Sequence, residues 1–359
     1  MLNYIEELNK LKSKKASADN PFYIMEVCGT HTMSIAECGL RQLLPSWVKL
    51  ISGPGCPVCV TPSNYVDALL DITDNKDVVV CCYGDLIRIP GSNKGDSLKA
   101  RKSLGADVRI VYSPMDALEI AKKETNKEVI FVGIGFETTA PGTAISIIEA
   151  KKQNVKNFSV LSLMKYTLQA VNKIVTDERC RLDGLICPGH VATIIGANAF
   201  KYLAKEYKIP CVVAGFKQDE IIRGVYDLCK LLCDETPMVI NDYKTCVEDE
   251  GNTVAMEYMG EVFEKEDAVW RGLGLIKDSG MKIKESYKEY DASVKFNYQP
   301  AEKENNNGCC CGQVLMGIIP PEKCPKYGKE CNPVDPLGPC MVSSEGACAA
   351  SYKYRGIIL

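Results

Sequence analysis

The sequence predicts an α/β protein in which parallel strands alternate with crossover helices, followed by a cysteine-rich tail. Up to about residue 240, short apolar runs alternate with helical patterns, which is typical of parallel sheets. The length of 359 residues predicts two or three domains, at roughly 100–200 residues per domain. Beyond residue 240 the alternation fades, and seven of the 19 cysteines fall in the last 51 residues.

The apolar runs and the helical patterns between them place the individual elements. Strands are expected at 22–27, 48–51, 78–82, 108–111, 129–134, 158–163, 184–187 and 210–214. Helices are expected at about 32–44, 63–73, 96–104, 114–124, 141–153, 166–178, 191–207 and 218–233. An amphipathic helix opens the chain. Ser113 and Pro114 form a typical helix start, because Ser caps the first turn and Pro fits its first position.

Composition excludes several classes of protein. The net charge is −3 and the pI about 5.7, so the charge gives no reason to expect nucleic acid or an anionic membrane as a partner. No apolar run is long enough to span a bilayer, and the charged N-terminus has no signal-peptide pattern. We therefore expect a cytoplasmic protein whose cysteines are metal ligands, catalytic thiols or buried residues.

Five loops rich in Gly and polar residues follow predicted strands. They carry Cys28-Gly-Thr-His31, the Cys56-Pro-Val-Cys59 pair behind Gly-Pro-Gly, the Gly-Phe-Glu137 turn, the Pro-Gly-His190 turn and a Gly-Phe-Lys turn. Ligands of open α/β sheets bind at the carboxyl ends of the strands. The loops therefore predict one or two sites on that rim, with simple tight turns as the alternative.

Two of these loops carry thiol chemistry. Cys28 precedes a predicted helix and lies near His31, which predicts a lowered thiol pKa suited to a nucleophile or a soft-metal ligand. Cys56 and Cys59 have the spacing of a redox disulfide or half of a metal site, and a structural pair is the alternative. The chain has only two histidines, and His190 also follows a strand.

The tail carries a second group of thiols. Cys311, Cys324, Cys331 and Cys348 have 12, 6 and 16 residues between them, and Cys340 is a fifth candidate. With no His in the tail, an all-thiolate site is expected, and thiolates favour iron–sulfur clusters or zinc. A 4Fe-4S cluster is the preferred interpretation, because a compact zinc site usually has paired C-x-x-C units. Zinc, or no metal, remains the alternative.

Five motifs in order along nearly the whole chain resemble the HypD family of hydrogenase maturation factors. They are Met25-Glu-Val-Cys-Gly-Thr-His31, Gly53-Pro-Gly-Cys-Pro-Val-Cys-Val-Thr-Pro62, Gly135-Phe-Glu-Thr-Thr-Ala-Pro141, Pro188-Gly-His-Val191 and Cys340-Met-Val-Ser-Ser-Glu-Gly-Ala-Cys348. The resemblance implies two parallel-sheet (Rossmann-like) domains around a cleft, plus a Cys-rich iron–sulfur subdomain. We place these at 1–125, 126–240 and 241–359.

The resemblance also implies a function. With the small chaperone HypC, such proteins form the scaffold on which the Fe(CN)2CO unit of NiFe-hydrogenase is built, and HypE, with HypF upstream, supplies cyanide. By motif, Cys28 would hold the iron and Cys56 with Cys59 would be the redox-active pair. Cys311, Cys324, Cys331 and Cys348 would bind the 4Fe-4S cluster, with Cys340 as the alternative fourth ligand.

Two further residues complete the candidate site. We hypothesise that His31 and Glu137 line the cleft and orient the bound ligands or exchange protons with them, because both lie at strand ends. The chain is then an assembly scaffold with redox centres rather than a turnover enzyme. A cluster-dependent thiol–disulfide oxidoreductase, with Cys56 and Cys59 as the active dithiol, is the alternative function, and a structural zinc protein is a third.

Overall fold

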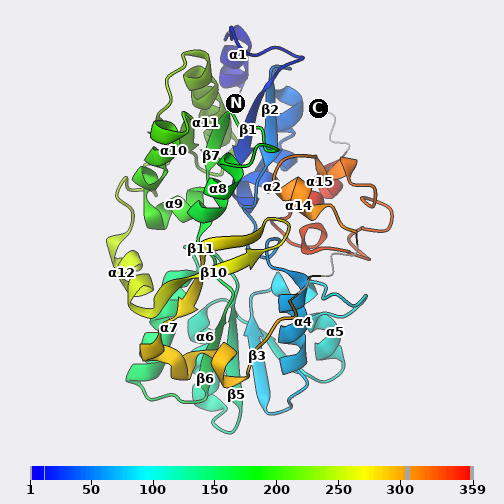
Figure 1. Cartoon of the computed structure of the whole chain (residues 1–359), viewed down its shortest axis with the longest axis vertical. Helices are drawn as coiled ribbons and strands as arrows, with labels where there is room; N and C mark the ends of the chain where they lie inside the picture. The colour runs from blue at the N-terminus through cyan, green and yellow to red at the C-terminus, as the bar shows by residue number, and fades with distance from the viewer. Residues whose placement is uncertain (1, 12, 303, 305–307, 356–359) are drawn as a thin grey trace.

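The chain folds around two parallel sheets, as the sequence predicts. The computed structural model describes residues 2–11, 13–302, 304 and 308–355, and Figure 1 shows one sheet in each half of the molecule. Sheet A has the order β2 (Val48–Ser52), β1 (Phe22–Glu26), β7 (Gly184–Cys187), β8 (Cys211–Val213), β9 (Val239–Asn241). Sheet B has the order β4 (Asp107–Ile110), β3 (Val78–Cys82), β5 (Glu128–Gly133), β6 (Phe158–Ser162).

Helices connect these strands and cover the sheets. The helices of the α/β part are α1 (Leu2–Lys10), α2 (Gly29–Glu37), α3 (Leu40–Leu43), α4 (Ser63–Ile72), α5 (Leu98–Ser103), α6 (Pro114–Lys123), α7 (Ala140–Lys152), α8 (Thr167–Val175), α9 (Gly189–Ile195), α10 (Lys201–Glu206) and α11 (Gln218–Cys233). Those that follow are α12 (Thr253–Val262), α13 (Ala292–Lys295), α14 (Cys311–Leu315) and α15 (Ala347–Tyr354). Short 3-10 turns are η1 (Leu86–Arg88), η2 (Ala197–Phe200), η3 (Glu285–Tyr290), η4 (Pro321–Lys323) and η5 (Pro339–Met341).

Two predicted helices are interrupted by glycine. The helix expected at 32–44 starts earlier and divides into α2 and α3 at Gly39, whose φ of 61° is left-handed. The helix expected at 191–207 breaks at Gly196, with φ of 81°, where a Cβ atom would lie 2.4 Å from the carbonyl oxygen of Asp249. The predicted start at Ser113 is confirmed, since Ser113 and Asp116 form a capping box.

The sheets do not follow the expected divisions of the chain. β1 and β2 lie in sheet A, the chain then builds all of sheet B, and it returns to sheet A with β7, which pairs with β1. The boundary placed after residue 125 falls between β4 and β5, which belong to one sheet. Strand pairing joins segments that are far apart in sequence, and local patterns carry no information about such partners.

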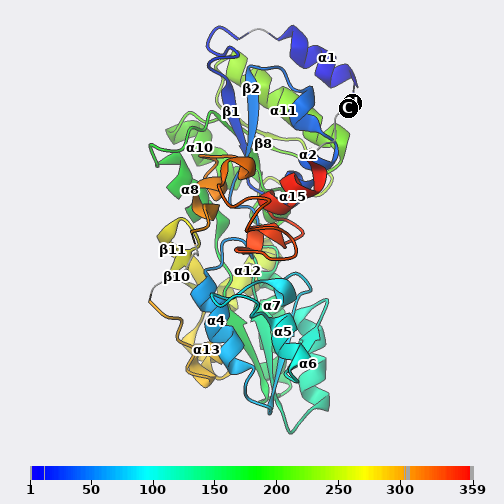
Figure 2. The same ribbon diagram turned by 90° about the vertical axis from the view of Figure 1, so that its right-hand side faces the viewer.

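Two elements beyond residue 240 connect the halves. β10 (Phe263–Trp270) and β11 (Gly274–Ile283) form an antiparallel hairpin, which lies between the two sheets in Figure 1. The sequence did not predict it, because the middle of β10 is a run of exposed charged residues without the alternation of a half-buried strand. Figure 2 shows the cysteine-rich tail (residues 309–359, described to 355) at the same level, with α15 against α2.

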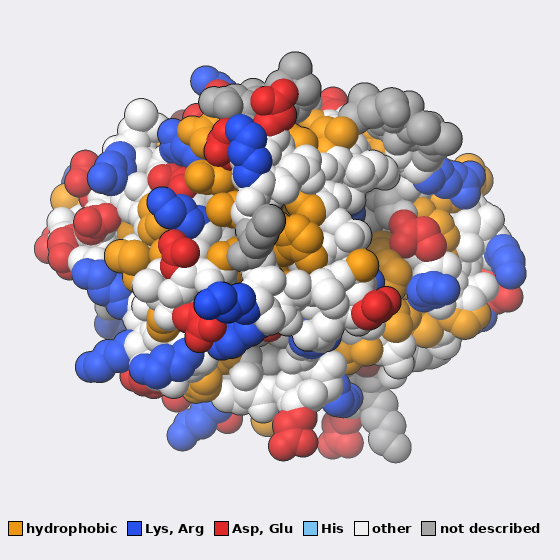
Figure 3. All heavy atoms as spheres, turned by 90° about the horizontal axis from the view of Figure 1, so that it is seen from above, with side chains coloured by type: hydrophobic (Ala, Val, Ile, Leu, Met, Phe, Trp, Pro, Cys, Tyr) orange, Lys and Arg blue, Asp and Glu red, His pale blue; other side chains and the backbone are white. Residues whose placement is uncertain are grey.

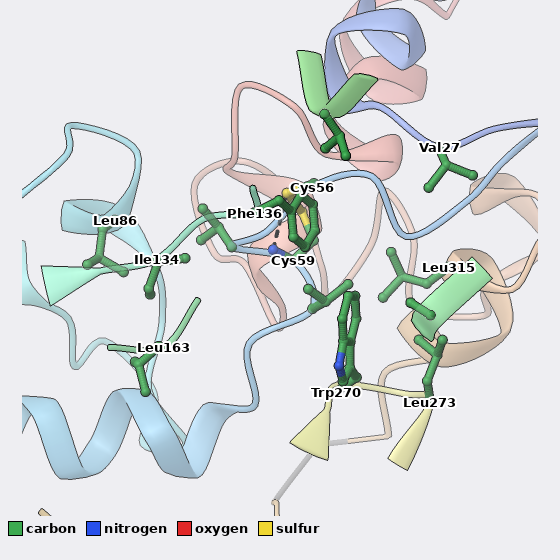
Figure 4. Packing of buried hydrophobic residues seen from close by; sticks show 14 of the residues in the cluster. Val27, Cys56, Cys59, Leu86, Ile134, Phe136, Leu163, Trp270, Leu273 and Leu315 are labelled. Atoms are coloured by element: carbon green, nitrogen blue, oxygen red, sulfur yellow. Dashed lines mark hydrogen bonds between the residues drawn. A yellow bond between two sulfur atoms is a disulfide. The ribbon is translucent and has the colours of Figure 1, made fainter. Parts of the chain in front are cut away.

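A continuous apolar core crosses from one half to the other. The same cluster of buried side chains contains Cys56, Cys59, Phe136, Trp270 and Leu315, which Figure 4 shows around the disulfide. Phe136 stacks on Trp270 with ring centroids 5.8 Å apart. The C-x-x-C pair is therefore packed at the junction of sheet B, the hairpin and the tail.

Surface charge is mixed. Lys, Arg, Asp and Glu side chains are interspersed on the face seen in Figure 3, with apolar side chains between them. Of the helices in the described part of the chain, none combines the length and apolar character that crossing a bilayer requires.

Candidate functional site

Cys28 lies at the carboxyl edge of sheet A. It follows β1 and is the N-cap residue of α2, while His190 follows the neighbouring strand β7 in the first turn of α9. The two strands run parallel, so their following loops meet, and the Cys28 Sγ is 3.8 Å from the His190 Nδ1. The structure therefore brings together two of the loops that the sequence singled out.

A third loop adds an aromatic ring. Phe216, which follows β8, stacks on His190 at 4.0 Å between ring centroids and lies 4.6 Å from the ring of His31. The His31 Nε2–H donates to the carbonyl of Gly215 at 3.0 Å, and its Nδ1 is buried without a hydrogen-bond partner among the described residues. His190 is therefore the histidine that contacts the Cys28 thiol, whereas His31 packs against Phe216.

Burial keeps these groups neutral. Burial raises the pKa of the Cys28 thiol to about 12, and the neighbouring Glu345 adds to this effect. Burial lowers the pKa of His31 to about 4 and also lowers the pKa of His190. The lowered thiol pKa expected from the helix N-terminus is therefore wrong for this state, because loss of water around the thiolate outweighs the helix dipole.

Two carboxylates that the sequence analysis did not select flank Cys28. Glu26 is fully buried and accepts hydrogen bonds from the Cys28 N–H at 3.3 Å and the Thr32 hydroxyl at 2.7 Å. Burial raises the pKa of Glu26 to about 7. Glu345, from the tail, packs against Gly29, the residue after Cys28. A Cβ atom added at Gly29 would lie 2.2 Å from the Cβ of Glu345. Glu26 precedes Cys28 by two residues, and Glu345 lies within the last motif.

The C-x-x-C pair lies next to the same turn. Cys56 and Cys59 form a disulfide, and both are buried. The Gly29 N–H donates to the carbonyl of Gly55 at 3.1 Å. A Cβ atom at Gly55 would lie only 2.3 Å from the Cys28 nitrogen, so only glycine permits this approach. The backbone of Cys28, the iron-ligand candidate, is therefore in direct contact with Gly55, the residue that precedes the redox-pair candidate.

Glu137 has a different neighbourhood. Its carboxylate accepts hydrogen bonds from the Thr167 N–H at 2.9 Å and from the Thr167 hydroxyl at 2.8 Å. Thr167 is the first residue of α8, so Glu137 satisfies the start of that helix, and burial raises its pKa. The structure brings Glu137 to α8 and not to Cys28, although its neighbour Phe136 reaches the core around the disulfide.

The tail gathers five cysteines. Cys311, Cys324, Cys331 and Cys340 are buried and Cys348 is half-buried. Burial raises the pKa of Cys348 well above its ordinary value, and the negative charges of the other four cysteines, as thiolates, raise it further. Among the described residues, no three His, Cys, Asp or Glu side chains converge closely enough to hold a single metal ion. The donor set is nevertheless all thiol, which suits soft metals.

One buried cation belongs to this group. Arg271, directly after β10, donates from Nε to the Cys311 Sγ at 3.1 Å. Hydrogen bonding from Cys309 and the charge of Arg271 lower the pKa of Cys311 to about 6. Arg271 was not predicted from the sequence, because nothing local marks an arginine after a charged segment as buried.

Two hollows lie beside sheet A. One of about 870 Å3 borders β9 and the start of α11, and another of about 510 Å3 follows the edge strand β2. Neither is lined by Cys28 or by the disulfide. The position of Cys28 in a cleft between two domains stays a prediction.

Fold and site define a class: an α/β protein of two parallel sheets that brings a buried thiol, a C-x-x-C disulfide and a cysteine-rich tail together. The model of the HypD family, described as the hydrogenase formation hypA family, matches residues 3–355. The hydrogenase maturation factor HypD of Rhodobacter capsulatus is 41% identical over 346 residues, covering 95% of this chain and 91% of that protein.

Other relatives agree. HypD of Escherichia coli is 41% identical over 357 residues, covering 99% of this chain and 95% of that protein. A putative hydrogenase expression/formation protein of Methanocaldococcus jannaschii is 40% identical over 353 residues, covering 98% and 96%. The chain belongs to the HypD family of hydrogenase maturation factors.

Proposed function

We propose that this chain is the scaffold on which, together with HypC, the Fe(CN)2CO unit of NiFe-hydrogenase is assembled. Cyanide would arrive from HypE, with HypF upstream. The observation that carries the proposal is the position of Cys28. Its thiol lies beside His190 at the carboxyl edge of sheet A and in backbone contact with the C-x-x-C loop. A thiolate is the soft donor that low-spin iron with cyanide and carbonyl ligands prefers.

In this proposal the iron unit is the substrate, and Cys28 Sγ is its ligand from this chain. The thiol must lose its proton when iron binds, and burial otherwise keeps it protonated. His190 Nδ1, at 3.8 Å, is placed to take that proton, and its ring is partly exposed so that the proton can leave to water. The charges of Glu345 and Glu26 also raise the pKa of the Cys28 thiol, so loss of its proton would depend on iron binding.

The tail would hold a 4Fe-4S cluster through Cys311, Cys324, Cys331 and Cys348, with Cys340 as the alternative ligand. The tail thiols lie close enough for the charges of the other four to raise the pKa of Cys348, and this closeness supports the proposal. The all-thiol donor set supports it as well. When bound, such a cluster supplies single electrons. The residues of the chain bury the site, and Arg271 places a positive charge against Cys311.

Cys56 and Cys59 would be a two-electron thiol–disulfide pair beside the iron ligand. Their disulfide is packed among Phe136, Trp270 and Leu315, which exclude water. Ser343 from the tail contacts the Cys56 Sγ at 3.3 Å. This contact joins the cysteine pair to the tail. We propose that the redox state of the pair responds both to iron at Cys28 and to the cluster in the tail.

The test is anaerobic co-purification of the full chain with HypC, HypE and HypF, followed by infrared spectroscopy. Cyanide and carbonyl bands should appear with the native chain and be lost in Cys28→Ser. Cys38→Ser is the matched control, because Cys38 is a buried free thiol just beyond α2 and should leave the bands unchanged. Bands of full intensity in Cys28→Ser would overturn the proposal.

A cluster-dependent thiol–disulfide oxidoreductase is the second candidate, favoured by the Cys56–Cys59 disulfide. It predicts that the purified chain, without HypC, reduces a generic disulfide substrate when supplied with electrons. Cys59→Ser should abolish that activity, and Cys28→Ser should leave it intact. Activity of this kind without infrared bands would favour the second candidate.

A further inference from the structure

Arg271 is the buried cation between the tail and the C-x-x-C loop. Its side chain is 2% exposed. Its Nε donates to the Cys311 Sγ at 3.1 Å, and its Nη1 lies 3.3 Å from the Glu304 Oε1. Its backbone N–H donates to the carbonyl of Val60 at 2.7 Å, and Val60 follows Cys59. Contacts at the backbone and at the guanidinium therefore hold Arg271 in place.

The charge of Arg271 reaches more than one thiol. At Gly338, a Cβ atom would lie 3.4 Å from the Cys309 Sγ and 3.5 Å from the Arg271 Nη2. The guanidinium therefore lies near the thiol of Cys309 as well as that of Cys311.

Backbone packing holds this arrangement. Gly272 has a φ of +78°, and a Cβ atom on it would lie 2.2 Å from the Gly312 Cα. The turn after β10 and the start of α14 therefore touch backbone to backbone, directly beside Arg271 and Cys311. This contact leaves the guanidinium little freedom to move away from the sulfur.

A fixed cation beside thiolate ligands has a definite electrostatic consequence. A 4Fe-4S cluster with four thiolates is negatively charged, and one added electron makes it more negative by one charge. A nearby positive charge and an N–H···S hydrogen bond stabilise the reduced form more than the oxidised form, so they raise the reduction potential. A neighbouring carboxylate acts in the opposite direction.

We propose that Arg271 raises the reduction potential of the tail cluster, with the paired Glu304 moderating its charge. The inference rests on the proposed function, since it requires the cluster. Arg271 is a positioning residue, because it binds a ligand sulfur and not the metal. Arg271 contacts both Cys311 and Val60, the residue after Cys59, so it links the tuned ligand to the C-x-x-C loop.

The experiment is a reductive titration of the full chain, reconstituted anaerobically with iron and sulfide. Dithionite supplies one electron per cluster in the presence of redox mediators, and electron paramagnetic resonance follows the reduced form. Arg271→Gln should shift the midpoint potential down, and Glu304→Gln should shift it up. Arg271→Lys, which keeps the charge without the planar fork, should fall between native and Arg271→Gln.

Arg109→Gln is the control, because Arg109 pairs with Asp107 on β4 of sheet B and should leave the potential unchanged. A purely structural role of Arg271 gives no reason for opposite shifts in the two charge variants. An assembled cluster with unchanged potential in Arg271→Gln would overturn the inference. If that variant assembles no cluster, unchanged potentials in Glu304→Gln and Arg271→Lys would overturn it. A native chain that binds no cluster refutes the proposed cofactor instead.

Discussion

The burial of Cys28 makes a quantitative prediction about its reactivity. The structure raises the thiol pKa from the ordinary 9.0 to about 12, chiefly by burial and secondly through Glu345. Thiolate is the reactive form, and below pH 9 each unit of pKa lowers its fraction about tenfold. At pH 8 Cys28 should therefore react with iodoacetamide about a thousandfold more slowly than an ordinary thiol of pKa 9.0. Glu345→Gln should speed the reaction, but by less than full exposure of the Cys28 thiol to water would, because burial is the larger cause of the raised pKa.

The assay follows alkylation of individual cysteines by peptide mass spectrometry in the metal-free protein. Cys246, which is exposed, is the internal reference, and unfolding the chain in denaturant should bring Cys28 to a comparable rate. Alkylation of folded Cys28 as fast as that of Cys246, or slower alkylation of Cys28 in Glu345→Gln, would contradict the prediction. A rate that rises tenfold per pH unit up to pH 10 would show that the reaction follows the thiolate fraction of a thiol whose pKa lies above 10.

Three other predictions concern stability, each measured by denaturant unfolding. Gly55→Ala should destabilise the fold by about 1–3 kcal/mol, because its Cβ meets the Cys28 backbone, whereas Gly260→Ala in α12 meets nothing within 4 Å and should be neutral or stabilising. Ser113→Ala should cost about 1 kcal/mol through loss of the α6 cap; an unchanged midpoint would show that the cap contributes nothing. Burial raises the pKa of Glu26 from 4.5 to about 7, so its contribution to stability is complete below pH 4.5 and lost as the pH rises through 7. That loss, about 3 kcal/mol at most, should disappear in Glu26→Gln, and an identical pH profile in the variant would contradict the assignment.

Local patterns were sufficient for most of the α/β part. The strands at 78–82 and 184–187 and the helix at 218–233 have the predicted bounds, because apolar periodicity and flanking Gly or Pro are local signals. The helix interruptions at Gly39 and Gly196 were missed. An isolated glycine in a helical pattern does not show whether its φ becomes positive, since packing decides that.

The candidate site divides in a similar way. Cys28, Cys56 and Cys59 were selected from motifs, and the structure brings their loops together. Glu137 was selected because it lies at a strand end, yet its contacts are with α8, because a carboxylate in that position can also satisfy a helix start. Arg271 was not selected, since its burial arises from a hairpin and a tail that meet only in three dimensions.

The α/β class, the loops that carry the thiols and the family of the chain follow from local patterns, because periodicity, spacing and motif order are properties of neighbouring residues. The pairing of β1 with β7, the contact of Cys28 with His190 and the position of Arg271 beside Cys311 arise only when the chain folds. Folding also reversed the expected pKa shift of Cys28. Strand pairing and burial depend on segments more than a hundred residues apart, and desolvation acts only once those segments have closed around the group.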